Sequence, residues 1–90
     1  MSNVMTPEQR LCAYLGSVAD AVKENNFFGA REDLAALKKV LKGRSDAAAT
    51  EIQKRFDDIA NAIKKHDKEA ALARVRAAMN SLDPFLPTET

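Results

Sequence analysis

The feature that most constrains the fold of this chain is a set of apolar positions that recurs after 41 residues. The first set is Leu11, Leu15, Val18, Val22, Ala30, Leu34, Leu37 and Leu41, and the second is Ile52, Phe56, Ile59, Ile63, Ala71, Val75, Ala78 and Leu82. Within each run of four, the steps are threes and fours, which place side chains on one face of a helix. The spacing therefore predicts two similar helical hairpins in tandem.

Capping signals mark the expected ends of the helices. Thr6 with Gln9 forms a capping box before the first helix, Ser45 is expected to cap the third and Asp67 the fourth. Gly43 follows the second helix, where a residue with positive φ commonly ends a helix. These signals predict helices over about residues 7–24, 27–42, 46–65 and 68–82.

Short connections and single apolar stripes define the predicted architecture. Connections of two to four residues make sequential helices antiparallel. Each helix has one apolar stripe, so the hairpins must pack on each other or on a second chain. We predict an all-α, antiparallel four-helix bundle forming one domain over residues 1–90, with a dimer that shares hairpins as the related solution. Residues 1–5 are expected to be a loose leader and residues 83–90 an extended tail, and Gly16 indicates close approach of two helices.

Cysteine content and hydropathy indicate a cytoplasmic protein that does not cross a membrane. Cys12 is the single cysteine, so no internal disulfide can form. The first nine residues lack the basic and then apolar pattern of a signal peptide. No apolar run approaches the roughly 18 residues that a membrane span requires.

The residues expected to face inward do not suit catalysis or metal binding. They are aliphatic residues, alanine and phenylalanine, whereas a di-iron bundle needs inward Glu and His. The single pair that could form a Cys/His nucleophile site is Cys12 with His66. Cys12 adjoins the apolar stripe and is interpreted as a small buried hydrophobe, and His66 falls at a helix end. We therefore predict no enzyme activity, no cofactor and no metal site.

The paired carboxylates do not change this prediction. Glu32–Asp33 and Asp57–Asp58 are adjacent along helices, so their side chains diverge by about 100° and do not converge on one substrate atom. The three glycines are isolated, and no phosphate-binding loop is present.

Two aromatic segments are the strongest candidates for contact with a partner. Phe27 and Phe28 correspond in the second hairpin to Lys68 and Glu69, which are solvent residues, so at least one ring is expected to be exposed. Phe85 lies between two prolines in the tail. Each segment has two interpretations: it covers an end of the bundle, or it docks on another chain.

Basic residues are concentrated in the middle of the chain. Formal net charge is +1, yet residues 38–76 carry eleven basic and six acidic side chains. Lys38, Lys39, Lys42 and Arg44 follow one another closely, and further cations lie on later helices. In an antiparallel bundle these charges are expected to divide between two poles and not to form the single stripe typical of nucleic-acid binders.

These observations favour a small cytoplasmic interaction protein that binds another protein by steric occupancy, as an inhibitor, adaptor or immunity-type factor. The predicted partner-binding residues are Phe27, Phe28, Phe85, Lys38, Lys39, Lys42 and Arg44. The alternative is a nucleic-acid-binding or nucleic-acid-associated regulatory module that uses the basic region 38–68, and we rank it second. A homodimer formed through the aromatic end is also compatible with the sequence.

Overall fold

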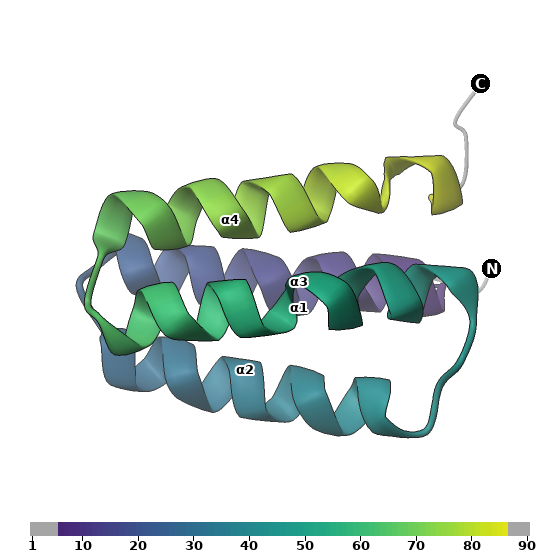
Figure 1. Cartoon of the computed structure of the whole chain (residues 1–90), viewed down its shortest axis with the longest axis horizontal. Coiled ribbons are helices and arrows are strands. Elements are labelled where there is room, and N and C mark those ends of the chain that lie inside the picture. The colour runs from purple at the N-terminus through teal and green to yellow at the C-terminus, as the bar shows by residue number, and fades with distance from the viewer. Residues whose placement is uncertain (1–5, 87–90) are drawn as a thin grey trace, which may run out of the picture.

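Four α-helices form an antiparallel bundle in the computed structural model, which describes residues 6–86 (Figure 1). They are α1 (Pro7–Lys23), α2 (Phe27–Lys42), α3 (Ala47–Lys64) and α4 (Lys68–Ser81), followed by a short 3-10 helix η1 (Asp83–Phe85). The predicted all-α bundle is confirmed, with helix bounds close to those expected. The predicted leader, residues 1–5, and residues 87–90 of the tail lie outside the described residues.

The helices are arranged so that each packs on two neighbours, with α1 beside α2 and α4, and α3 beside α2 and α4. The α1–α2 and α3–α4 turns lie together at one end of the bundle, which we call the turn end (Figure 1). The α2–α3 connection lies at the opposite end, which we call the loop end, together with the start of α1 and with η1. Residues near 27 and 66 are therefore far from residues near 44 and 85.

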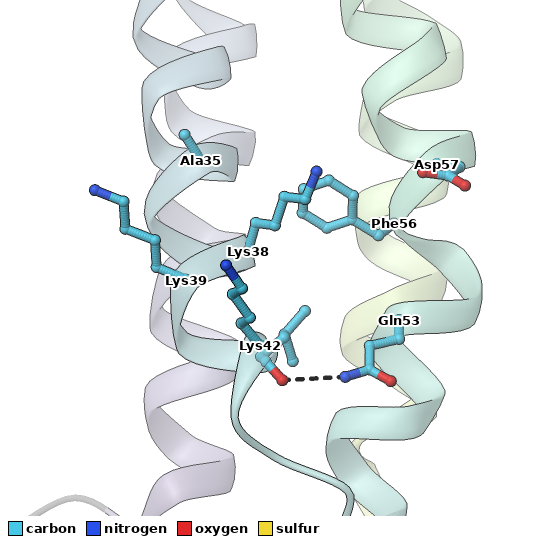
Figure 2. Close-up of a pocket in the computed structure, with 8 residues that line it drawn as sticks. Ala35, Lys38, Lys39, Lys42, Gln53, Phe56 and Asp57 are labelled. Atoms are coloured by element: carbon cyan, nitrogen blue, oxygen red, sulfur yellow. Dashed lines mark hydrogen bonds between the residues drawn. The ribbon is translucent and has the colours of Figure 1, made fainter.

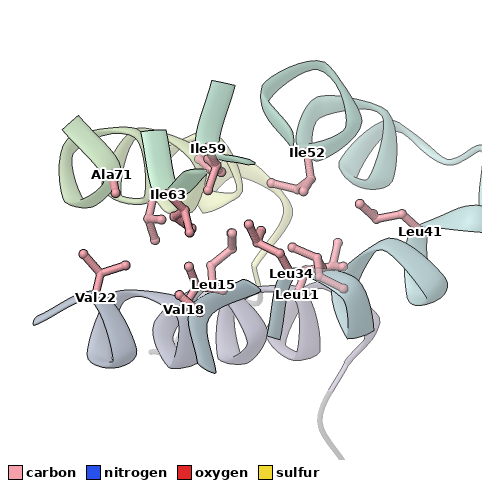
Figure 3. Close-up of a cluster of buried hydrophobic side chains, with 14 of the residues drawn as sticks. Leu11, Leu15, Val18, Val22, Leu34, Leu41, Ile52, Ile59, Ile63 and Ala71 are labelled. Carbon is pink, nitrogen blue, oxygen red and sulfur yellow. The ribbon is translucent and has the colours of Figure 1, made fainter. Parts of the chain in front are cut away.

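The core consists of the residues that the repeat predicts. Fifteen of the sixteen repeated positions are buried, and Figure 3 shows side chains from all four helices meeting between the two hairpins. No polar or charged residue is buried among residues 6–86. Phe56 is the exception to the pattern, because it is only partly buried although its counterpart Leu15 is fully buried.

The repeat extends into the backbone of the two hairpin turns. Asn25 and His66, which are 41 residues apart, both have a positive φ, of 61° and 56°. The amides of Asn25 and Asn26 donate to the carbonyls of Val22 and Ala21, at 2.9 and 2.8 Å. The corresponding amides of the second turn, those of residues 66 and 67, bond in the same way. Both turns therefore end their helices with the same Schellman hydrogen bonds.

The expected positive φ at Gly43 is wrong, because Gly43 has a φ of −99°. The α2–α3 connection closes the helix by other means. The side-chain amide of Gln53 donates to the carbonyls of Leu41 and Arg44, at 3.1 and 3.3 Å. Because a side chain from α3 satisfies the end of α2, the backbone does not need a left-handed residue there.

Two of the predicted caps are confirmed and one is wrong. The Thr6–Gln9 capping box is present, and the carboxylate of Asp67 accepts from the amide of residue 70 at 3.1 Å. Asp46, and not Ser45, caps α3 by accepting from the amide of residue 49 at 3.4 Å. The carboxylate of Asp46 has a further role that a hydroxyl could not fill, since it also binds the guanidinium of Arg44.

Two further expectations are corrected. Gly16 is not required for close helix approach, because a Cβ added there would meet nothing within 4 Å. The tail is not extended where it is described, because residues 83–85 form η1. Pro84 suits the first turn of such a helix, and the amide of Phe85 donates to the carbonyl of Leu82 at 2.9 Å.

The ion pair between Arg44 and Asp46 at the loop end leads to a prediction about pH. Hydrogen bonds from Arg44, at 2.6 and 2.8 Å, lower the pKa of Asp46 from 3.8 to about 2. Because the pKa is lowered by folding, the ionised carboxylate stabilises the fold above the ordinary value, and this contribution is lost as pH falls toward 2. Arg44→Gln is expected to return the pKa of Asp46 toward its ordinary value, as measured by NMR titration of the carboxyl carbon. The stability difference between variant and wild type should shrink between pH 5 and pH 2, and an unchanged Asp46 titration would contradict this account.

Candidate binding groove

An open groove runs between α2 and α3, and we call it the α2/α3 groove. It consists of two adjoining hollows of about 540 and 250 Å³, which share Ala35, Lys38 and Phe56 in their walls. The apolar residues that line it are Leu34, Ala35, Leu41, Phe56 and Ala60. A hollow of the larger size falls within the range of roughly 300–1,000 Å³ typical of ligand sites.

The groove is lined by five cations and one anion. The cations are Arg31, Lys38, Lys39, Lys42 and Lys64, and the anion is Asp57. In Figure 2, Lys38 extends from α2 toward Phe56 on α3, whereas Lys39 directs its ammonium away from α3. All five cations are exposed. Cations from both helices therefore border one seam, whereas Arg44, Lys65 and Lys68 of the basic region do not line it.

The repeat explains why this seam stays open. Its counterpart is the seam between α1 and α4, where residues 41 positions from Arg31 and Lys38 are Leu72 and Met79. Leu72 and Met79 are partly buried and pack against the core. The α1/α4 seam is more closely packed than the α2/α3 seam, although a hollow of about 360 Å³, lined in part by Leu72 and Met79, remains there. Long cations keep their charged ends in water, so they cover the α2/α3 seam less than leucine and methionine cover the other.

Phe56 is exposed in part for the same reason. Its counterpart Leu15 lies fully buried beneath the α1/α4 seam. Phe56 packs against the core with one side and lines both hollows of the groove with the other. A ring that is partly desolvated already and ordered by its neighbours loses little conformational entropy when a partner covers it.

At the turn end, the groove continues into an aromatic surface. Arg31 lines the groove and also a further hollow formed with Phe27, Phe28 and His66. Phe28 is 72% exposed, which confirms that at least one of the adjacent phenylalanines faces solvent. Phe27 is half-buried and stacks on the ring of His66, with centroids 4.6 Å apart. His66 thus packs as an aromatic platform in the α3–α4 turn.

The structure does not bring all of the predicted contact residues together. Lys38, Lys39 and Lys42 line the groove, and Phe28 lies at its far end. Phe85, 36% exposed, lies on η1 at the loop end. Arg44 also lies there, where it binds Asp46 and approaches a carboxylate oxygen of Glu8 at 3.5 Å. Its guanidinium is therefore engaged within the fold.

Cys12 has the surroundings of a structural thiol. It is partly buried, not fully buried as expected, and packs against the core. Burial, and to a lesser degree the carboxylate of Asp83, raise the pKa of the Cys12 thiol above its usual value. A raised pKa keeps the thiol protonated at neutral pH, whereas a nucleophilic cysteine needs a lowered one.

Sequence reasoning missed Phe56, Arg31 and Lys64 as parts of one site. Phe56 was assigned to the buried stripe because it occupies a repeated apolar position. The groove could have been identified from the residues of α2 and α4 that lie just beside the core-facing stripe of each helix. Comparing Arg31 and Lys38 with Leu72 and Met79 shows that one seam is basic where its counterpart is apolar.

Comparisons with family models, with curated proteins and with solved structures found no match to this chain. None of the helices described is both long and apolar enough to cross a bilayer. Within residues 6–86, no three His, Cys, Asp or Glu side chains are grouped as metal ligands would be.

Proposed function

We propose that this protein is a cytoplasmic binding module that engages another protein through the α2/α3 groove and Phe28. The observation that carries the proposal is an apolar floor left open beside a cationic α2 wall, in a seam that packs less closely than its counterpart. Apolar area that the fold covers more fully with its own side chains beside Leu72 and Met79 is here available to a partner. Occupancy of a partner's surface by this groove would suit an inhibitor, adaptor or immunity-type factor.

Phe56 and Phe28 are the proposed anchors, and the cations orient the partner. Burying a phenylalanine ring contributes roughly 1.5–3 kcal/mol, so two partly exposed rings can supply much of an interface's energy. Rim cations add association rate and selectivity more than affinity. Phe85 and Arg44 lie at the loop end and do not line the groove, so they are not part of this proposed surface.

Photo-cross-linking tests the proposal in the cell that makes the protein. Lys39→p-benzoylphenylalanine places a cross-linker on the groove rim without filling the groove, since this side chain points away from α3 (Figure 2). The matched control is Lys54→p-benzoylphenylalanine, at an exposed position of α3 that does not line the groove. A covalent adduct with one defined protein at position 39 but not at position 54 is the expected result. An adduct with a second copy would identify the partner as the chain itself, and no adduct would overturn the proposal.

Nucleic-acid binding is the second candidate, and the gathering of five cations beside Phe56 favours it. Single strands bind in basic grooves whose aromatic rings stack on bases. The net charge of +1 and the apolar floor argue for protein instead. A salt titration separates the two, because affinity for nucleic acid falls steeply with salt as counterions are released. An apolar protein interface should weaken only slightly over the same range.

The two adjacent phenylalanines should respond differently to substitution. Phe28→Ser is expected to leave helix content and melting temperature within error of wild type, because the ring is largely exposed, and to reduce the adduct at position 39 strongly. Phe27→Ser should instead cost about 1 kcal/mol, since it removes the stacking on His66. Circular dichroism and cross-linking yield measure both effects. If Phe28→Ser unfolds the protein or leaves the yield unchanged, Phe28 is not an anchor.

A further inference from the structure

We infer that the segment held in the α2/α3 groove is an amphipathic α-helix with acidic residues beside its apolar stripe. This inference rests on the proposed function and names the chemistry of the partner. It follows from three properties of the groove: the backbone that surrounds it, the spacing of its walls and the distribution of its charges.

The backbone around the groove excludes an added strand. Both walls are α-helices whose amides and carbonyls bond within the helix, so they offer no free edge to an extended peptide. A peptide lying on this apolar floor must satisfy its own backbone. A helix does so, and it presents a continuous apolar face to the floor.

The wall residues have the spacing of a helix-packing seam. Four of the α2 wall residues, with Phe28 just beyond the groove, recur in steps of three and four, and three of the α3 wall residues are four apart. They are Phe28, Arg31, Ala35, Lys38 and Lys42 on α2, and Phe56, Ala60 and Lys64 on α3. The α2 stripe lies next to the stripe that faces the core. From Phe28 to Lys42 it extends roughly 21 Å at 1.5 Å per residue, which matches a partner helix of about 15 residues. Large side chains at every third or fourth position of such a helix would lie between the two walls.

The charges require acidic residues on the partner. Arg31, Lys38 and Lys42 form a row along α2, and Lys64 faces them from α3. The single acidic lining residue, Asp57, is also on α3. A partner helix is therefore expected to carry most of its Asp and Glu on the side that faces α2. A helix with Lys or Arg in those positions would meet like charges along that wall.

Three helical peptides of 15 residues test the inference. The first has leucines at three- and four-residue steps flanked by glutamates, the second has lysine in place of every glutamate, and the third has the composition of the first with its leucines dispersed. Titration calorimetry and amide chemical shifts are measured with the full chain. The first peptide is expected to bind and to shift the amides of Lys38 and Phe56. The other two should bind at least about tenfold more weakly, since several rim charges or the whole apolar stripe are mismatched.

Charge reversal in the protein supplies the matched test. Lys38→Glu with Lys42→Glu changes exposed side chains, so the fold should be retained. Three cations and three anions would then line the groove, so the variant should lose its preference for the glutamate peptide over the lysine peptide. Lys54→Glu, away from the groove, should leave the preference for the glutamate peptide unchanged. For the wild-type protein, equal binding of both charged peptides, amide shifts located outside the groove, or no binding of the first peptide would overturn the inference. Because cross-linking at position 39 does not depend on these peptides, a protein adduct with no peptide binding would leave the proposed function standing and remove only the acidic helix.

Discussion

Arg31→Leu combined with Lys38→Met is expected to stabilise the protein and abolish binding in the α2/α3 groove. The two substitutions copy Leu72 and Met79, which occupy the same repeat positions in the α1/α4 seam. Apolar side chains of this length can pack against the ring of Phe56 and fill part of the hollow that the cations leave open. We expect the free energy of unfolding to rise by about 1 kcal/mol, because the gain from burying part of two apolar side chains is only partly offset by the loss of the packed Arg and Lys stems. In a domain of this size that gain raises the melting temperature by roughly 4–8 °C.

Thermal unfolding and the cross-linking assay measure the two effects of this double variant. Lys54→Met is the control, because it introduces the same side chain outside the groove and should change neither quantity by much. The reverse substitution, Met79→Lys, should loosen the α1/α4 seam and cost about 1–2 kcal/mol. A double variant that is less stable than wild type, or that still forms the adduct, would show that Arg31 and Lys38 do not keep the groove open.

Leu15→Ala is expected to lower the free energy of unfolding by about 3 kcal/mol, which is the typical cost of a large cavity in a core. Leu15 is completely buried among the apolar residues shown in Figure 3. Total stability for a domain of this length is roughly 5–13 kcal/mol, so the loss is a large share of it. Denaturant titration followed by circular dichroism measures the change.

Two further substitutions serve as comparisons for Leu15→Ala. Lys54→Ala replaces an exposed side chain on a helix and should change stability by no more than about 0.5 kcal/mol. Phe56→Leu places at the repeated position the residue found in the first hairpin, and it should cost less than Leu15→Ala while reducing the adduct at position 39. A loss of under 1 kcal/mol for Leu15→Ala would contradict the central place of this stripe in the core.

The repeat predicted the buried side of the molecule correctly because core placement follows from short-range geometry. Steps of three and four residues put Val18 or Ile59 on the same face as their neighbours in any helix, and four such faces bury their apolar area together. Capping at Thr6 and Asp67 was predictable for the same reason, since each cap involves residues three positions apart. Ser45 was predicted wrongly although the contacts that favour Asp46 as the cap are also local, since Asp46 binds Arg44 and the amide of residue 49. Gly43 was predicted wrongly because Gln53 donates to the carbonyls of Leu41 and Arg44 on either side of it, and this depends on how α3 folds back.

The sequence by itself determined that four apolar stripes pair into a bundle and that one of two adjacent phenylalanines lies exposed. Both conclusions depend on residues close together along the chain. Only the tertiary structure decided that Arg31, Lys38 and Lys64 surround Phe56, because this depends on how closely α2 and α3 approach one another. Long side chains on facing helices determine that distance, and their effect appears only when two helices from different hairpins lie side by side. The groove is therefore a property of the packed bundle, whereas its floor was already present in the 41-residue pattern.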